Sequence, residues 1–540
     1  MQLIWKRTRH FIPCALLCLY PPFFVFSRTA GLTESHHLLF ASLAGLAFAG
    51  TLSLFAWCAF RKTPNPARAA GILATVIGGY SLLYGHLFSA LYQGALDYFY
   101  HQREANPPDV LIKIGLHGFL LLLLIWLFLF TRRKVAALSA GIQETVARLS
   151  LVFSAPLLIM ALPVELLFSS AEPTHKQVAS SPSGSQTGTL PDIYHIVLDG
   201  YARQDVLEQY YGFSNSRFIE SLESAGFMVS RNARANYNWT VLSLGSMLNR
   251  EYINQYTSPT DGSWKVGAQL LRDNRVSKEL KAKGYTYIHM ASTWGASRDN
   301  DNADIVHRCG GSFMQNEYYR VLVEGSLLRL MTFLGSQDLA ECHRQNFQWL
   351  GHSVDETEGP AYVFAHFILP HHPYLFDADG NILKHATLSD QFDFQQVLWS
   401  DRSSYLAQLK YVNHEVESAV ARILAGRDRP AVIIIQSDHG PQLVNSEREM
   451  EAGFHHARSA IFLAVRLPQP ATTELPDSAI NLYRWLFNEL FAESHSMLPY
   501  HYYSSPFKAP YYFFEIDLST MNETDKEAAR NPGSAVSPAE

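Results

Sequence analysis

Five apolar stretches in the first 170 residues limit the folds that are open to this chain. They run over about residues 11–26, 37–60, 69–91, 114–130 and 149–168. Each is near the roughly 20 residues that a helix needs to cross the hydrocarbon core of a bilayer. Pro21 and Pro22 interrupt the first stretch, so a cleaved signal peptide is the alternative there, but further apolar stretches follow and no small-residue cleavage pattern is present. We therefore expect a transmembrane domain of about five helices over residues 1–168.

The charges between these stretches predict the orientation of the membrane domain. Positive residues collect before the first stretch, between the second and third, and after the fourth: Lys6, Arg7, Arg9, Arg61, Lys62, Arg68, Arg132, Arg133 and Lys134. The alternate loops carry only Arg28, Arg103 and Lys113. Because cytoplasmic loops are rich in Lys and Arg, we expect a cytoplasmic N-terminus in the inner (plasma) membrane. Five crossings then place the rest of the chain in the periplasm or outside the cell.

Composition excludes one class of partner and leaves one covalent bond open. The formal net charge is −6, and without a basic excess we expect no nucleic acid as a partner. Cys14, Cys18 and Cys58 fall in apolar stretches, so only Cys309 and Cys342 remain outside them. These two cysteines could form one disulfide in an oxidising compartment, but the sequence does not decide whether they do.

The rest of the chain has the pattern of an α/β domain. We expect a flexible linker over residues 169–190, which is rich in Ser and Pro, a folded domain over 191–515 and a disordered tail over 516–540. Short apolar runs predict strands at 193–198, 285–290, 361–369, 431–437 and 460–467, and helical patterns between them lie at 216–224, 276–283 and 403–424. This alternation predicts a mostly parallel sheet with helices on both faces.

Acidic and imidazole side chains follow several of the predicted strands. Asp199 follows the first strand, and the fourth strand ends in Asp438-His439-Gly440. Two pairs of histidines lie at the third strand and before the fifth: His371, His372, His455 and His456. Each group alone could be an ordinary turn or surface loop. Together at the carboxyl edge of one sheet they predict a divalent metal site, with Zn²⁺, Mn²⁺ or Ca²⁺ as the ion.

A hydroxyl near these groups would complete a catalytic site. In "NWTVLSLGSMLN", Thr240 opens a predicted helix, where backbone N–H groups and the helix dipole favour a phosphate or sulfate. A metal can lower the pKa of such a hydroxyl so that it attacks as an alkoxide. Two alternatives are a simple N-cap threonine and a glycosylation site at Asn238, which begins an Asn-x-Thr sequon.

The order of these motifs resembles the alkaline phosphatase/sulfatase superfamily. Asp-Gly at the first strand, Thr-x-x-Ser-Leu at a helix start, Pro-His-x-Pro-Tyr and Ser-Asp-His-Gly occur in that order. With the membrane region in front, the chain looks most like lipoteichoic acid synthases and phosphoethanolamine transferases. The resemblance implies that Asp199, Thr240, Asp438 and His439 are metal ligands and that Thr240 is also the nucleophile. It implies that His371 contacts the substrate and also acts in catalysis, and that His455 or His456, with His456 slightly favoured, is a second such contact. We include His372 beside His371 among the expected substrate-binding residues.

Two departures from the superfamily narrow the expected chemistry. A threonine cannot become the formylglycine of sulfatases, so the resemblance favours phosphate over sulfate esters. The Asp-x-x-x-His pair of the two-metal members is absent before His371, so we expect one metal.

The resemblance implies a metal-dependent phosphotransferase. It would move a phosphoglycerol or phosphoethanolamine headgroup from a membrane lipid to an envelope glycan or lipid. The alternatives are a phosphodiesterase or sulfuric ester hydrolase of the same fold, and a non-catalytic membrane scaffold or regulator.

Overall fold

The chain forms two compact units, each with its own core. The structure is a computed structural model that describes residues 8–28, 33, 35–101, 109–162, 190–309, 316–334, 336–355, 357–383, 401–426, 429–443, 452–507 and 509–518. Unit 1 comprises Met1–Ala171 and Asn316–Ser336, and unit 2 comprises Glu172–Gln315 and Gln337–Glu540. The predicted linker up to residue 189 and the predicted tail from residue 519 lie outside the described residues.

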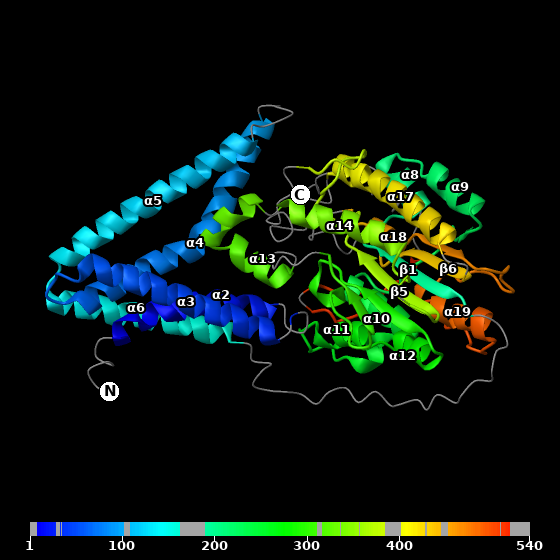
Figure 1. Ribbon diagram of the computed structural model, residues 1–540, viewed down its shortest axis with the longest axis horizontal. Helices are drawn as coiled ribbons and strands as arrows, with labels where there is room; N and C mark the ends of the chain where they lie inside the picture. Colours follow the sequence, from blue (N-terminus) through cyan, green and yellow to red (C-terminus); the bar gives the residue numbers. More distant parts are fainter. Residues whose placement is uncertain are drawn as a thin grey trace, which may run out of the picture. The chain divides into compact units, whose positions relative to one another are not determined.

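Unit 1 contains the five predicted apolar helices (Figure 1). They are α2 (Ile12–Arg28), α3 (Ser35–Phe60), α4 (Pro66–His101), α5 (Asp109–Ala137) and α6 (Ala140–Ala161), with the short η1 (Arg9–Phe11) before α2. All five have the length and composition to cross a membrane. Many of their large apolar side chains are exposed, including Leu122 and Phe153, as expected where lipid rather than protein surrounds a helix.

A segment from far along the chain also belongs to unit 1. It consists of α13 (Glu317–Glu324) and η5 (Leu327–Leu334), about 150 residues after the last apolar helix. The chain leaves unit 2 after Cys309 and returns to it before Cys342. Cys309 and Cys342 form a disulfide, with their Cα atoms 5.2 Å apart. The pairing that the sequence leaves open is therefore present, and it closes the loop that contains this segment.

Unit 2 is built on a seven-stranded sheet. Its order is β2 (Met228–Val229), β7 (Leu463–Arg466), β6 (Ala431–Ser437), β1 (Asp192–Leu198), β5 (Ala361–Phe367), β3 (Thr286–Met290) and β4 (Ile305–His307). β1 pairs in parallel with β6 and β5, and β3 and β4 continue in parallel beyond β5. β7 is antiparallel to β6, so its first residues lie at the edge where the parallel strands end.

Helices cover both faces of this sheet (Figure 1). One face carries α8 (Gln204–Tyr211), α9 (Ser216–Ser224), α14 (Ser336–Leu350) and α17 (Arg402–Ala425), whose apolar side chains join the main core. The other side carries α10 (Thr240–Asn249), α11 (Lys265–Arg272), α12 (Arg275–Ala282) and α19 (Leu482–Phe491). The remaining elements are α18 (Ala452–Ser459), η2 (Ile253–Tyr256), η3 (Gly295–Ser297), η7 (Ala479–Asn481) and a hairpin of β8 (Tyr503–Ser504) and β9 (Phe514–Glu515).

The predicted fold class is confirmed, and all five predicted strands are present. The sequence did not predict β2 and β4, which have two and three residues and pair at the two ends of the sheet. Runs this short give no periodic signal. The antiparallel direction of β7 was also not predicted, because a buried strand has the same apolar pattern in either direction.

Candidate active site

Two buried carboxylates face each other where β1 and β6 end. Leu198 pairs with Ser437 in the parallel ladder, so the residues that follow, Asp199 and Asp438, lie side by side. The Gly200 backbone N–H donates to Asp438 Oδ1 over 3.1 Å. Among the described residues, Asp199 Oδ1 and Asp438 Oδ2 are buried without a hydrogen-bond donor. A buried carboxylate oxygen without a donor or a counter-charge costs free energy. A cation bound between the two carboxylates would remove this cost.

The electrostatics of this pair lead to the same conclusion. Burial, together with the negative charge of Asp199, raises the pKa of Asp438 to about 7. Burial also raises the pKa of Asp199, but the nearby imidazoles of His371, His366 and His439 outweigh it and lower that pKa overall. Two carboxylates that resist sharing one pocket as anions are suited to a divalent cation, which neutralises both.

A third potential metal ligand, His366, was missed in the sequence. Its ring, Asp199 and Asp438 each offer a ligand atom, and these atoms all lie within 4.8 Å of one another. His366 Nε2 is 3.6 Å from Asp199 Oδ2. The residue sits inside β5 rather than after it, and a single histidine in an apolar run is usually a core residue. Its position beside the last residues of β1, opposite Val197, was the signal that could have found it.

A chain of hydrogen bonds determines the tautomer of the His366 ring. Ser292 Oγ donates to the Trp294 carbonyl over 2.9 Å, so in its 2.8 Å bond with Ser297 it accepts the Ser297 hydroxyl proton. Ser297 Oγ therefore accepts from His366 Nδ1, 2.7 Å away. With its proton on Nδ1, the ring turns the lone pair of Nε2 towards the carboxylates, which is the state in which histidine binds a metal.

Thr240 lies beside this group as the first residue of α10. Trp239 is the N-cap and makes no side-chain cap bond, so the alternative that Thr240 is a simple N-cap threonine does not hold. The Thr240 hydroxyl lies 3.1 Å from His439 Nε2. His439 Nδ1 donates to the Gly440 carbonyl over 3.0 Å, which leaves Nε2 as the acceptor. The Thr240 hydroxyl therefore donates to His439, and a proton acceptor is in place for a nucleophile.

A buried arginine that the sequence reasoning missed, Arg458 of α18, holds the two loops together. Its Nε donates to the Asn238 carbonyl over 2.7 Å and its Nη1 to the Gly440 carbonyl over 2.9 Å. Its Nη2 donates to His439 Nε2 over 2.9 Å. The guanidinium thus fixes the segment before Thr240 against the loop after β6.

The sequon at Asn238 is part of the core. The Asn238 side chain donates to the Ser505 carbonyl over 3.0 Å and accepts from the Ser505 backbone N–H over 3.2 Å. The residue is 2% exposed, so no glycan fits there in the folded protein, and the glycosylation alternative does not hold. These bonds, with that from Trp239 Nε1 to Ser505, anchor the start of α10.

The four predicted substrate-binding histidines occupy different surroundings. The loop of His371 and His372 is joined to the site by the His371 backbone N–H, which donates to the Asp199 carbonyl over 3.1 Å. His455 is buried against Phe454 and Tyr502, and burial lowers its pKa to about 4. His456 Nε2 lies 3.3 Å from Asp205 Oδ2 of α8. The structure therefore brings Asp199, Thr240, Asp438, His439 and the backbone of His371 together, while His456 is paired with α8.

Gly440 has no room for a side chain, and its replacement should disturb the site. A Cβ there would lie 1.9 Å from the Ala457 carbonyl oxygen and 2.9 Å from that of Ala460. We expect Gly440→Ala to push the β6 loop from α18 and to cost roughly 1–3 kcal/mol of stability. Thermal unfolding of the purified variant measures this. Gly359→Ala is the control because nothing lies within 4 Å of its Cβ position, and equal melting temperatures for the two variants would contradict the prediction.

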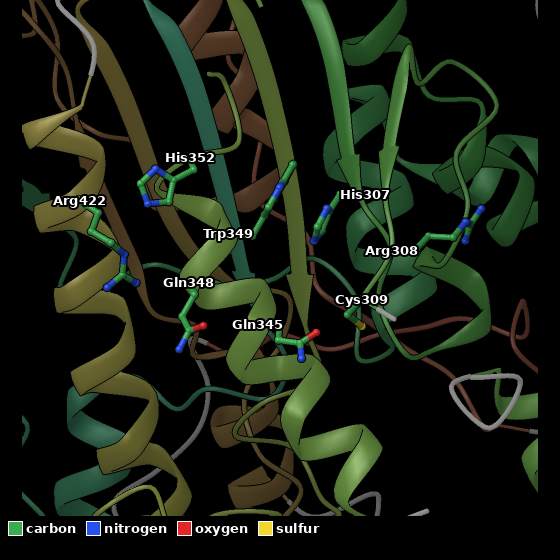
Figure 2. A pocket seen from close by; sticks show the side chains of 8 residues that line it. All are labelled: His307, Arg308, Cys309, Gln345, Gln348, Trp349, His352 and Arg422. Atoms are coloured by element: carbon green, nitrogen blue, oxygen red, sulfur yellow. The ribbon is translucent and has the colours of Figure 1, made fainter. Parts of the chain in front are cut away.

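A separate cavity of about 650 Å³ lies on the flank of unit 2 (Figure 2). Its lining comes from the end of β4, from α14 and the turn after it, and from α17: His307, Arg308, Cys309, Gln345, Gln348, Trp349, His352 and Arg422. Trp349 stacks on His307 at a ring distance of 3.7 Å, and Arg308 is paired with Asp299. None of the predicted catalytic or metal-binding residues lines this cavity, so we assign it no part in their chemistry.

A family model described as Sulfatase matches residues 191–462, and a comparison with curated proteins found no significant match. One similar solved structure is the C-terminal periplasmic domain of EcEptC from Escherichia coli in complex with Zn, with 11% identity, coverage of 64% of this chain and 97% of that chain, and a TM-score of 0.42. Another is the integral membrane protein lipooligosaccharide phosphoethanolamine transferase A (EptA) from Neisseria meningitidis, with 11% identity, coverage of 89% and 95%, and a TM-score of 0.39.

The family match spans the elements that build the site. It extends from just before β1 to just before β7 and so includes Asp199, Thr240, His366, Asp438 and Arg458. It covers half of the chain, and it contains both carboxylates, the hydroxyl and the imidazoles of the site described above. This chain belongs to the sulfatase family.

Proposed function

We propose that this protein is a membrane-bound, metal-dependent phosphotransferase with Thr240 as its nucleophile. It would move a phospholipid headgroup of the phosphoglycerol or phosphoethanolamine type to an extracytoplasmic acceptor, a glycan or lipid of the cell envelope. The observation that carries the proposal is the Thr240 hydroxyl, which donates to His439 Nε2 at the N-terminus of a buried helix beside two carboxylates. Such a hydroxyl can be deprotonated and also lies where an anionic phosphate is favoured.

The residues of the site fit one divalent cation, Zn²⁺, Mn²⁺ or Ca²⁺. Asp199, Asp438 and His366 would hold it, since their unpaired buried atoms converge, and His439 and Thr240 adjoin them. When bound, the cation would supply Lewis-acid stabilisation of the Thr240 alkoxide and of the phosphate charge. His439 and Thr240 remain predicted ligands beside this group, since His439 Nε2 lies 3.2 Å from Asp438 Oδ2 and 3.1 Å from the Thr240 hydroxyl.

The reaction would proceed in two displacements at phosphorus. Thr240 Oγ1 bonds to phosphorus as its proton passes to His439 Nε2, and the bond from phosphorus to the diacylglycerol oxygen breaks as that oxygen takes a proton from His371. An acceptor hydroxyl then displaces Thr240 from phosphorus. The acceptor hydroxyl gives its proton to His371, and His439 returns its own to Thr240. The His371 backbone N–H donates to the Asp199 carbonyl over 3.1 Å, which joins the loop of His371 to the site.

Ser297 should act as a positioning residue for the metal site. Ser297→Ala would leave His366 Nδ1 without its acceptor and free the ring to change tautomer. Removing the hydrogen-bond partner of a metal-binding histidine usually lowers the metal affinity about 10–100-fold. We therefore expect Mn²⁺ or Zn²⁺ binding to weaken by about that factor. Titration calorimetry of the purified full chain measures it. Ser258→Ala, at an exposed loop serine, is the control, and equal affinities for the two variants would show that Ser297 does not position the ring.

The contacts of the segment Asn316–Leu334 support the proposed orientation. The segment follows all five apolar helices, and it contacts Pro22 near the end of α2, His37 near the start of α3 and Ser89 late in α4. Loop charges assign these three ends to the side opposite the N-terminus. An odd number of crossings also puts the segment on that side. We therefore propose an inner-membrane protein with a cytoplasmic N-terminus and a periplasmic or extracellular sulfatase domain.

Lipid turnover by the reconstituted protein tests the function. The full chain would be placed in vesicles with headgroup-labelled phosphatidylethanolamine or phosphatidylglycerol, Mn²⁺ or Zn²⁺, and an envelope glycolipid. Diacylglycerol release with label on the glycolipid is the expected result. If diacylglycerol is released and all of the label appears as a water-soluble headgroup phosphate, the protein is instead a phosphodiesterase of the same fold. Absence of both products and of bound metal would favour a non-catalytic membrane protein.

A further inference from the structure

We propose that Asn316–Leu334, which we call the docking segment, fastens the sulfatase domain to the membrane helices and confines the reaction to donors in the bilayer. This inference rests on the proposed function for its substrate. It concerns a part of the chain that supplies none of the site residues. The docking segment comes from within unit 2 in sequence, yet it packs in unit 1.

The first half of the docking segment is bound to α2 and α3 by specific polar contacts. Tyr318 is 2% exposed, and its hydroxyl donates to the Pro22 carbonyl over 2.9 Å. The ring of His37 joins two residues of the segment: Asn316 Nδ2 donates to its Nε2 over 3.1 Å, and its Nδ1 lies 2.9 Å from the Tyr319 hydroxyl. Tyr318 also packs with Phe26 and Leu38 in one apolar cluster. Contacts of this kind select one position rather than a loose association.

The second half of the docking segment is bound to α4. Arg329 is 4% exposed, its Nη1 donates to Ser89 Oγ over 2.9 Å, and its guanidinium lies 4.5 Å from the centre of the Phe88 ring. Leu327 and Leu330 pack on the cluster that includes Tyr84 and Phe88. Ionisable side chains buried among membrane helices are costly, so a buried arginine there marks a functional contact.

The backbones of the docking segment and of α4 meet at a glycine. A Cβ at Gly85 would lie 1.8 Å from the Glu324 carbonyl oxygen and 2.5 Å from the carbonyl carbon of Gly325. Small residues allow such close approach between membrane helices. The contact therefore depends on Gly85, and a single methyl group there is enough to separate the two elements.

Covalent connections turn this contact into a fastening. The docking segment lies in the loop that the Cys309–Cys342 disulfide closes, so it remains joined to unit 2 at both ends of the loop. Together with the connection that follows α6, the chain then passes between the two units at three places in the sequence. Each connection limits how far the sulfatase domain can move from the membrane helices, and such a limit raises the effective concentration of bilayer donors at its site.

The test compares two glycine variants of the full chain in vesicles. Gly85→Ala removes the close contact, and Gly118→Ala is the matched control, since nothing lies within 4 Å of its Cβ position in α5. Each is assayed with dioleoyl phosphatidylethanolamine in the bilayer and with monomeric dihexanoyl phosphatidylethanolamine in solution. The phosphatidylglycerol pair is assayed in the same way. We expect Gly85→Ala to lower the bilayer-donor rate at least tenfold with the soluble-donor rate within twofold, and Gly118→Ala to change neither.

The outcomes separate this inference from the proposed function. If Gly85→Ala changes both rates equally, or neither, the docking segment does not select bilayer donors and the inference fails. If the wild type releases no diacylglycerol from any donor, the proposed function fails. Hydrogen exchange still tests the docking in that case: amides of the docking segment should exchange faster in Gly85→Ala than in Gly118→Ala, and equal exchange would overturn it.

Discussion

Thr240→Ala should reduce the release of diacylglycerol from labelled phospholipid by about 10³-fold or more, since loss of a nucleophile removes the covalent route altogether. The hydroxyl it deletes is the one that donates to His439 Nε2. Alanine has a high helix propensity and adds no atoms, so α10 should remain folded. Initial rates of the reconstituted variant and the wild type, at equal metal occupancy, give the ratio.

Thr240→Ser is the matched variant for this prediction. It keeps the hydroxyl and loses only a methyl group, so we expect its rate to fall within about 100-fold of the wild-type rate. A wild-type rate in Thr240→Ala would rule out Thr240 as the nucleophile. Equal loss in both variants with lowered melting temperatures would show that the position is structural.

The second large effect is expected on stability, from Asp438→Asn and from metal removal. Because the pKa of Asp438 is about 7, both carboxylates are ionised and repel each other in the metal-free protein only above about pH 7. At such a pH, Asn removes one charge and keeps the oxygen that accepts from the Gly200 N–H. We therefore expect metal-free Asp438→Asn to melt above the metal-free wild type. Saturating Mn²⁺ or Zn²⁺ should stabilise the wild type by about 3 kcal/mol at a hundredfold excess over Kd, and the variant by much less.

Thermal melts with and without a chelator measure both halves of this prediction. Asp379→Asn is the control, because Asp379 is exposed and lies outside the converging group of ligands. If added metal raised the melting temperature of Asp438→Asn as much as that of the wild type, Asp438 would not be a ligand. If the metal-free variant melted below the metal-free wild type, the two carboxylates would not repel each other.

The sequence was sufficient for the parts of the site that follow strands. Asp199 and Asp438 come directly after long apolar runs, and parallel strands bring such positions to one edge whatever the rest of the fold does. Thr240 was found because small residues and a hydroxyl open an apolar helical pattern. In these cases local pattern and topology are enough to place a residue near its partners.

The sequence could not predict contacts between residues that are far apart along the chain and meet only in the fold. His366 lies within a buried strand, and its role depends on the adjacent β1 and on the bond to Ser297. Arg458 of α18 joins the segment before α10 to the loop after β6, and these segments meet only in the folded domain. The docking segment has the sequence pattern of an ordinary apolar helix. That pattern does not distinguish a helix packed in unit 1 from a helix packed on the sulfatase domain.

Intact mass spectrometry tests the central claim most directly. The purified wild type and Thr240→Ala would each be incubated with phosphatidylethanolamine or phosphatidylglycerol and Mn²⁺ or Zn²⁺, then quenched in acid without an acceptor. The account predicts an added phosphoethanolamine or phosphoglycerol mass on the wild type alone, with fragmentation placing it on Thr240. The same adduct on Thr240→Ala, or diacylglycerol release with the adduct on another residue, would contradict it.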